Sequence, residues 1–322
     1  MSNVLVTGGA GFIGTHLCHV LKEAGHFVHV LDLVDPKSPV KGVHYHKGDV
    51  RDLKSIKQAL KGMDVVYHLA AIVSVPLCQQ MPIDGYQTNL LGTVNVAQSA
   101  VEEMQNSGKQ VRMIFSSSAA VYGDLGKKDT SLLESVLLPH PLSFYAAQKL
   151  GSEHLLRFYW ETKKLPVVTF RFFNVFGPGQ DPHSPYSGVI TVFASALEKK
   201  SPLFLNGGGF QTRDFVSVYD IAKACCLALD LPVSQCDGLP INLGTEKAVT
   251  IEQLAKTMKE VSKQDIPIKE APPRSGDVLH SLAGIQRANE VLKWAPQITL
   301  SQGLKDLYTV SDLRPANPPV YS

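Results

Sequence analysis

The chain has 322 residues, with 31 Lys and Arg residues against 29 Asp and Glu residues, and a formal net charge of +2 at pH 7. No run of Lys and Arg is longer than two, so we expect neither nucleic acid nor an anionic membrane surface as a partner. The five cysteines show no metal-ligand spacing, and no apolar run approaches the roughly 20 residues of a membrane-spanning helix. The first apolar run begins at Val4, which predicts no signal peptide. We expect a cytoplasmic protein with reduced thiols and no bound metal.

Residues 4–14 predict a phosphate-binding turn. Val4–Val6 is an apolar run typical of a buried parallel strand, and Gly8, Gly9 and Gly11 follow it. Such glycines let the backbone turn tightly and approach a pyrophosphate, while Gly14 lets the next helix pack closely on the strand. The N–H groups that open this helix favour an anionic ligand.

The first half of the chain alternates apolar strands with helices. Strands are expected at 4–6, 27–32, 43–47, 65–69 and 111–115, and helices at about 11–25, from about 53, at about 82–106 and at about 143–162. This rhythm predicts an α/β fold with a Rossmann-type, doubly wound parallel sheet. Ligands of such sheets bind at the carboxyl ends of the strands.

Asp32 ends the apolar run Phe27–Leu31, about 20 residues after the glycine cluster. A carboxylate at this place can accept both hydroxyls of an adenine ribose and repels a 2′-phosphate, which favours NAD over NADP. NADP stays an alternative because of Lys37, since a basic residue here can accommodate that phosphate. Asp49 either accepts the adenine amine or caps the helix that begins near Leu53.

Small residues follow the fourth strand, where the backbone of a dinucleotide must pass. They are Leu69, Ala70 and Ala71, and His68 before them is expected to be a hydrogen-bonded structural histidine. The predicted cofactor-binding set is Gly8, Gly11, Phe12, Ile13, Gly14, Asp32, Asp49, Val50, Leu69, Ala70, Ala71, Tyr145 and Lys149.

A catalytic pattern follows the fifth strand, which ends in a serine run at 116–118. Tyr145 and Lys149 are four residues apart, so they share one face of the predicted helix. A lysine ammonium favours a phenolate, and we therefore expect a lowered pKa of Tyr145 and a role for it as general base. Ser118 can hydrogen-bond the reacting hydroxyl from the same crevice.

In these motifs the chain resembles the extended short-chain dehydrogenase/reductase family, and within it the NAD-dependent nucleotide-sugar 4-epimerases. The resemblance covers nearly the whole chain, and its elements are residues 7–14, 117–123, Tyr145 with Lys149, 171–178, 211–215 and 274–277. It implies that Ser118, Tyr145 and Lys149 form the catalytic trio. It also implies that Asn89 is a structural asparagine near the site.

The resemblance implies a UDP-sugar substrate held by the second half of the chain. The expected substrate-binding set is Ser118, Tyr145, Asn174, Gly188, Val189, Leu203, Arg213, Arg274, Asp277 and Ser281. Arg213 and Arg274 can clamp a diphosphate, since a guanidinium fork binds phosphate oxygens bidentately. Gly188 opens a helix whose N–H groups can face the substrate, and the apolar run 203–205, of which Leu203 is the residue chosen, offers surface to a uracil ring. The sequence departs from the family pattern at Asn206–Phe210, so the sequence does not predict which residues form the nucleoside pocket.

The implied activity is 4-epimerisation of a UDP-hexose or UDP-N-acetylhexosamine through a 4-keto intermediate. Tyr145 takes the proton of the sugar 4-hydroxyl while NAD accepts the hydride, and the sugar then turns before reduction on its other face. By similarity Ser281 borders the 2-substituent, where a small side chain leaves room for an acetamido group. A 4,6-dehydratase or a decarboxylase needs an acid that Ala119 and Ala120 do not supply. A nucleotide-sugar reductase and a non-catalytic dinucleotide sensor stay open as alternatives.

The regular alternation stops near residue 174, which predicts a second domain. The expected limits are 1–173 for the NAD-binding domain with a returning segment near 215–245, 174–312 for the substrate domain and 313–322 for an irregular tail. The resemblance further implies a homodimer formed through the helices at about 82–106 and 143–162.

Overall fold

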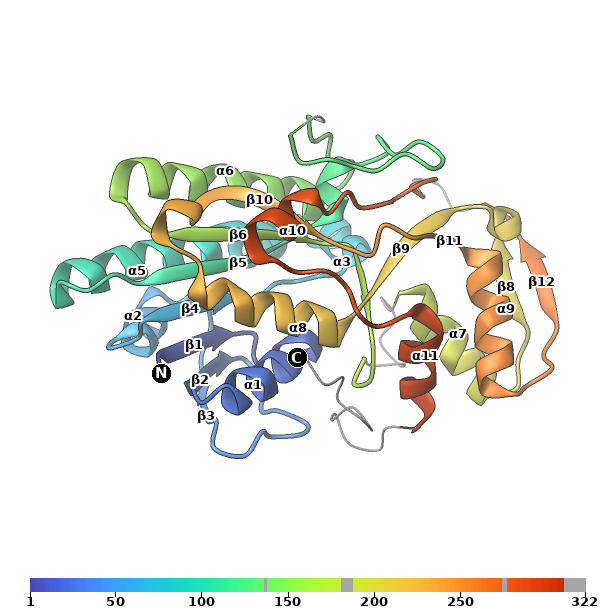
Figure 1. Ribbon diagram of the computed structural model, residues 1–322, viewed down its shortest axis with the longest axis horizontal. Helices are drawn as coiled ribbons and strands as arrows, with labels where there is room; N and C mark the ends of the chain where they lie inside the picture. Colours follow the sequence, from blue (N-terminus) through green and yellow to red (C-terminus); the bar gives the residue numbers. More distant parts are fainter. Residues whose placement is uncertain (136–137, 181–187, 274–276, 310–322) are drawn as a thin grey trace.

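Seven parallel strands form the large sheet of the protein (Figure 1). The computed structural model describes residues 1–135, 138–180, 188–273 and 277–309. The strand order is β10-β6-β5-β4-β1-β2-β3. The bounds are β1 (Asn3–Thr7), β2 (Phe27–Asp32), β3 (His44–Lys47), β4 (Val65–His68), β5 (Arg112–Ser118), β6 (Val167–Phe172) and β10 (Asp237–Leu243). The sheet is thus a doubly wound parallel sheet, as the sequence predicts.

The strands in the middle of the sheet are apolar because helices cover them on both sides. Every residue of β4 and β6 is buried, and so are all residues of β1 after Asn3. Parallel strands between two helical layers are expected to read as continuous apolar runs. The edge strand β3 is mostly exposed and polar.

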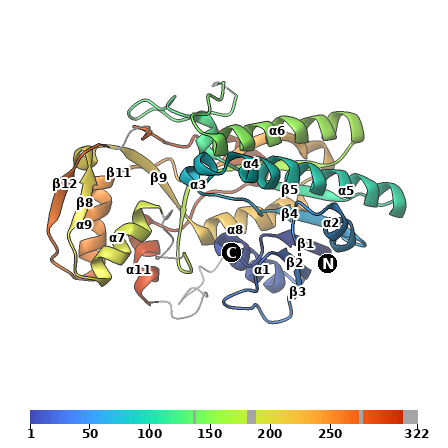
Figure 2. The same cartoon turned by 180° about the vertical axis from the view of Figure 1, so that it is seen from behind.

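Two helical layers enclose the large sheet. One layer packs against a core that includes Leu17 and Ile221, and it consists of α1 (Phe12–Glu23), α8 (Val218–Leu227) and α10 (Gln286–Leu292). The other packs against a core that includes Ile56 and Leu156, and it consists of α2 (Leu53–Leu60), α5 (Gly92–Ser107) and α6 (Phe144–Lys163). Figure 2 shows α5 and α6 side by side along this second face.

The long helix expected at 82–106 is interrupted in the structure. It consists of α4 (Pro82–Gly85), a π-helical segment at Tyr86–Leu91 and α5, and the sequence did not indicate α3 (Val75–Gln80) before it. Widened turns of this kind are frequent at functional sites. The predicted helix at 143–162 is α6, whose start is capped by the Ser143 hydroxyl accepting from the Ala146 N–H.

A smaller lobe lies at the side of the large sheet and has its own core (Figure 1). Its strands are β7 (Asn174–Phe176), β8 (Leu203–Asn206), β9 (Thr212–Ser217), β11 (Ala248–Thr250) and β12 (Ile268–Ala271). Its helices are α7 (Val189–Glu198), α9 (Ile251–Ser262) and α11 (Leu300–Thr309).

Short 3-10 turns along the chain lie at Ala119–Tyr122, Gly207–Gly209, Ala228–Asp230 and Val233–Gln235. In the part of the chain described, no helix is long and apolar enough to cross a membrane.

The chain passes between the lobe and the large sheet more than once. After β9 it forms α8 and β10 on the large sheet, and it reaches this core again with Ala283 and Trp294. The sequence did not indicate this second return. The domain limits given above stay predictions, since the lobes share these connections.

Asp214 on β9 ties these crossings together. Its buried carboxylate accepts hydrogen bonds from the backbone N–H groups of Thr245 at 2.7 Å, Glu246 at 3.0 Å and Ala283 at 3.1 Å. It also accepts the Thr245 hydroxyl at 2.6 Å. Burial raises the pKa of Asp214, and these four hydrogen bonds act against that rise.

We expect Asp214→Asn to lower the free energy of unfolding by about 1–3 kcal/mol, because an amide NH₂ cannot accept and leaves a buried N–H unpaired. Chemical denaturation followed by circular dichroism measures this change. Asp265→Asn is the control, since that carboxylate is on the surface and pairs with Lys259, and it should change stability little. Equal stabilities of the two variants would show that Asp214 does not tie the crossings.

Candidate functional site

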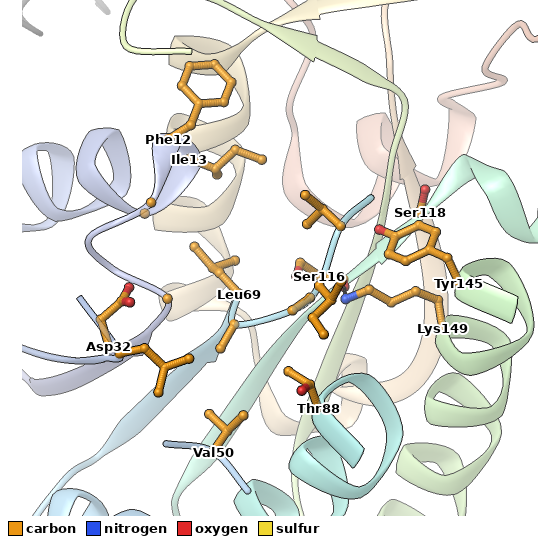
Figure 3. Close-up of a pocket in the computed structure, with 18 of the residues that line it drawn as sticks. Phe12, Ile13, Asp32, Val50, Leu69, Thr88, Ser116, Ser118, Tyr145 and Lys149 are labelled. Carbon is orange, nitrogen blue, oxygen red and sulfur yellow. Dashed lines mark hydrogen bonds between the residues drawn. The ribbon is translucent and has the colours of Figure 1, made fainter. Parts of the chain in front are cut away.

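A cavity of about 690 Å³ opens at the carboxyl ends of β1, β4 and β5, beside the point where the strand order reverses. Its wall contains every residue of the predicted cofactor-binding set, and Ser118 as well. Figure 3 shows Asp32 at one end of the cavity and Ser118, Tyr145 and Lys149 at the other. The site is therefore long enough to separate an anchoring end from a reactive end.

The glycine turn after β1 packs closely on the turn after β4. Gly8 has φ +75°, and a Cβ there would lie 2.6 Å from the Ala70 nitrogen. Gly11 precedes α1 without a side-chain cap, and the first turn of α1 has no acidic residue. The first N–H groups of α1 thus lack intrahelical acceptors and favour an anion in the cavity.

Asp32 is held in place at the anchoring end. Its carboxylate accepts from the N–H groups of Ala10 at 3.0 Å and Val34 at 3.2 Å. Asp32 lines the cavity, whereas Lys37 lies outside the residues that line it.

Asp49 lies in the cavity wall and is paired with its neighbour Arg51, whose Nη2 is 2.6 Å away. The alternative role for Asp49, a cap of α2, is wrong. The cap is Asp52, which accepts from the N–H groups of Lys54 and Ser55.

Ser118, Tyr145 and Lys149 come together at the reactive end. A hydrogen bond joins Tyr145 to Ser118, and Lys149 donates to the Ser116 carbonyl at 2.7 Å. The Lys149 ammonium lies 4.8 Å from the centre of the Phe115 ring and 6.0 Å from that of Tyr145. Two buried titratable groups on one helix face thus meet a hydroxyl at the end of β5.

The expected lowering of the pKa of Tyr145 is wrong for this structure. Burial raises the pKa of Tyr145 to about 12, because it removes water from the phenolate, and the Ser118 hydrogen bond offsets only part of this. Burial also lowers the pKa of Lys149 to about 8, against the attraction of Glu153. The Lys149 ammonium donates to the Ser116 carbonyl. The four-residue spacing of Tyr145 and Lys149 therefore did not predict the direction in which the pKa of Tyr145 shifts.

Two buried side chains support the site without lining it. His68 lies between Thr7 Oγ1 at 2.7 Å and Thr93 Oγ1 at 3.0 Å, which confirms the expected structural histidine. Burial lowers the pKa of His68 to about 3, with a smaller effect of the Lys149 charge. Asn89 bonds both backbone groups of Ile72 and donates to Gln148 Oε1 at 2.8 Å. It joins a loop in the cavity wall to the helix that carries Tyr145.

Residues 4–244 match the family described as the NAD dependent epimerase/dehydratase family. The chain belongs to this family. One curated relative is the UDP-glucose 4-epimerase of Halalkalibacterium halodurans, with 30% identity over 91% of this chain and 90% of the relative.

Two solved structures show the same fold over nearly the whole chain. The UDP-glucose 4-epimerase of Thermotoga maritima, solved with UDP-glucose, has 32% identity and a TM-score of 0.87 over 95% of this chain and 97% of its own. The UDP-N-acetylglucosamine 4-epimerase of Methanobrevibacter ruminantium M1 has 34% identity and a TM-score of 0.85, over 95% and 96%. Relatives with other names also match, among them a UDP-N-acetyl-alpha-D-glucosaminuronate decarboxylase, so the comparisons do not fix the substrate of this epimerase/dehydratase family member.

NAD is the cofactor of this family, and the cavity fits it. The glycine turn leaves no Cβ between Gly8 and Ala70, the uncapped start of α1 suits a pyrophosphate, and Asp32 suits an unphosphorylated ribose. These residues would hold NAD with its nicotinamide end toward Tyr145. Sequence reasoning missed other lining residues, because only the folded chain brings them to the cavity: Thr88, Phe173, Val175 and Gln180.

Two members of the predicted substrate-binding set, Ser118 and Tyr145, lie at the reactive end, and another member, Leu203, is wrong. Leu203 is 0% exposed in the core of the smaller lobe, so it cannot contact a uracil ring. Successive residues of a strand face opposite sides, and Phe204, with 53% exposure, is the one on the outer side. Arg274 lies outside the described residues.

The other predicted substrate residues occupy defined places. Asn174 is exposed at the start of β7, and Gly188 is the residue before α7, which Val189 begins. Arg213 donates to Asp277 at 2.5 Å and to the Thr212 carbonyl at 2.9 Å. Ser281 is buried, and its N–H donates to the Thr212 carbonyl at 3.2 Å. None of these other predicted substrate residues belongs to the cavity wall.

We expect Asp32→Asn to reduce the preference for NADH over NADPH by about tenfold to a hundredfold. It removes both the charge that repels a 2′-phosphate and charge-assisted hydrogen bonds worth about 1.5–3 kcal/mol. Fluorescence titration with each nucleotide gives the ratio of affinities. Asp35→Asn, an exposed carboxylate three positions on, is the matched control. An unchanged ratio in Asp32→Asn would place the ribose elsewhere.

Proposed function

We propose that this protein is an NAD-dependent 4-epimerase of UDP-hexoses or UDP-N-acetylhexosamines. The observation that carries the proposal is the meeting of Ser118, Tyr145 and Lys149 at one end of the cavity that the predicted cofactor-binding residues line. The 4-epimerase names of several relatives, two of them solved with a UDP-sugar, support it.

In the proposed mechanism the chain moves one proton and holds the sugar. NAD, when bound, would supply the hydride acceptor for the sugar C4. Tyr145 takes the proton of the 4-hydroxyl, and Ser118 donates a hydrogen bond to the same oxygen. Lys149 favours the phenolate by its charge. When the 4-keto sugar has turned, C4 would regain the hydride from the reduced cofactor on its other face while Tyr145 returns the proton to the oxygen, and the opposite configuration at C4 results.

Other reactions of the family are less well supported by the residues present. An elimination needs an acid near the serine of the site, and Ala119 and Ala120 stand at those positions. One relative is named a decarboxylase, and the same lack of an acid argues against that chemistry here. A net reductase would consume free NADH, which distinguishes it from an epimerase that regenerates NAD.

Arg213 and Asp277 are proposed to face the nucleotide of the substrate. Their ion pair is only partly exposed, and burial lowers the pKa of Arg213 while Asp277 raises it. The pair holds the guanidinium in a fixed direction, and a diphosphate can then accept its remaining N–H groups. Phe204 replaces Leu203 as the proposed apolar contact of the base.

A homodimer through the helices at 82–107 and α6 is part of the proposal. Both segments carry exposed apolar side chains, among them Leu91 at 41% and Phe158 at 62%. Large exposed apolar residues on neighbouring helices suit a helix-to-helix interface. Sedimentation equilibrium of the wild type and of Phe158→Glu tests it.

The proposed function is tested by incubating the purified protein with UDP-glucose and with UDP-N-acetylglucosamine, without added cofactor. We expect the corresponding 4-epimers, separated by anion-exchange chromatography, and NAD as the nucleotide released on denaturation. NADP as the main nucleotide, or a need for stoichiometric cofactor, would overturn the epimerase assignment.

Tyr145→Phe should slow epimerisation by about a hundredfold or more, since a positioned acid–base group typically contributes that much. The ring and its packing are preserved, so the Kd for UDP, measured calorimetrically, should stay unchanged. Unchanged turnover would make Tyr145 a packing residue.

Ser281→Tyr should lower kcat/KM for N-acetylated substrates by about tenfold to a hundredfold, from an overpacking cost of about 1–3 kcal/mol. Plain hexoses should be affected much less, because they lack the acetamido group. Wild type and variant are compared on both substrate pairs. Equal losses on both pairs, or a wild type without N-acetyl activity, would remove the proposed role of Ser281.

A further inference from the structure

Glu153 lies behind the reactive end, one helical turn after Lys149 on α6. It is 6% exposed and does not line the cavity. Its Oε1 accepts a short hydrogen bond from the Ser117 hydroxyl, and it accepts from Arg171 Nε at 3.0 Å. Its Oε2 accepts from Arg171 Nη2 at 2.6 Å. The carboxylate therefore joins α6 to both β5 and β6.

Arg171 compensates the buried negative charge. It is 3% exposed, pairs with Ser117 in the register of β5 and β6, and lies 4.7 Å from the centre of the Tyr122 ring. Burial lowers the pKa of Arg171, but the hydrogen bonds and charge of Glu153 act against this effect. The net result is a raised pKa of Arg171. The two side chains form a buried ion pair with both partners present.

The end of β5 that Glu153 holds carries two groups of the proposed active site, the Ser116 carbonyl and the Ser118 hydroxyl. Ser117 stands between Ser116, whose carbonyl accepts from Lys149 Nζ at 2.7 Å, and Ser118. A movement of Ser117 would displace both neighbours. The charge of Glu153 also bears on Lys149, since it raises the pKa of that lysine while burial lowers it.

We propose that Glu153 is a positioning residue that fixes the Ser116–Ser118 end of β5 and keeps a negative charge beside Lys149. This inference rests on the proposed function. Titratable or charged groups act on Lys149 from three elements: Tyr145 and Glu153 on α6, His68 on β4 and Cys78 on α3, while Arg171 on β6 pairs with Glu153. Glu153 is the carboxylate in this set.

The test is Glu153→Gln, in which an amide of the same size still accepts the Ser117 hydroxyl but carries no charge. Without that charge Lys149 loses its proton at lower pH, and the alkaline limb of the kcat/KM profile should move down by on the order of one pH unit. At pH 8.5 this is a loss of up to about tenfold, whereas KM should stay nearly constant because Glu153 does not line the cavity. The pH dependence of NADH affinity should show the same displacement.

Glu161→Gln is the matched control. Glu161 is also on α6 and also pairs with an arginine, Arg157, at 2.7 Å, but it lies on the surface. Neither the alkaline limb nor the NADH profile should move in this variant.

A folded Glu153→Gln protein with the wild-type alkaline limb would overturn the inference and leave Glu153 a purely structural residue. If Glu153→Gln does not fold, Glu153→Gln/Arg171→Met removes both charges and leaves none unpaired. The limb should still move down, because Glu153 rather than Arg171 acts on Lys149. If the wild type binds NADH but epimerises no UDP-sugar, the proposed function fails, and the NADH profile still decides the role of Glu153.

Discussion

The contact of two backbone turns at Gly8 and Ala70 determines where the rest of the site lies. The turns end β1 and β4, the strands on either side of the point where the sheet order reverses. A Cβ at Gly8 would meet the Ala70 nitrogen, so only glycine lets the two turns come this close. The start of α1 then faces the cavity with unpaired N–H groups, and Asp32 and Tyr145 fall at its two ends. A single steric condition thus brings the two turns together at the cavity.

Local patterns predicted the part of the site that depends on chain order. The glycine turn, Asp32 after the second strand and the four-residue spacing of Tyr145 and Lys149 each lie within one β-α unit or one helix turn, and all line one cavity. The parallel sheet followed from the same alternation, because strands joined by helices must run in one direction.

What the sequence did not predict depends on contacts between distant segments. The alternation of side chains along β8 places Leu203 and Phe204 on opposite faces but does not show which face meets the core. That core is formed by residues far apart in the sequence. The Arg213–Asp277 pair spans 64 positions. The pKa of Tyr145 depends on the burial of its helix, which a spacing of four cannot show. The spacing of four residues places Glu153 on the same helix face as Lys149. Its role, however, depends on contacts with Ser117 and Arg171, which are distant in the sequence.

The electrostatics of the reactive end make its proton position depend on what fills the cavity. With a pKa of about 12, Tyr145 holds its proton at neutral pH, and with a pKa of about 8, Lys149 is mostly charged but close to losing its charge. A further positive charge beside Tyr145 favours its phenolate. In the proposed orientation the oxidised nicotinamide ring is cationic and the reduced ring is neutral. Under the proposed function, Tyr145 would therefore more often be a phenolate, able to take a proton, when a sugar is to be oxidised, and more often protonated, able to give one, when the ketone is to be reduced.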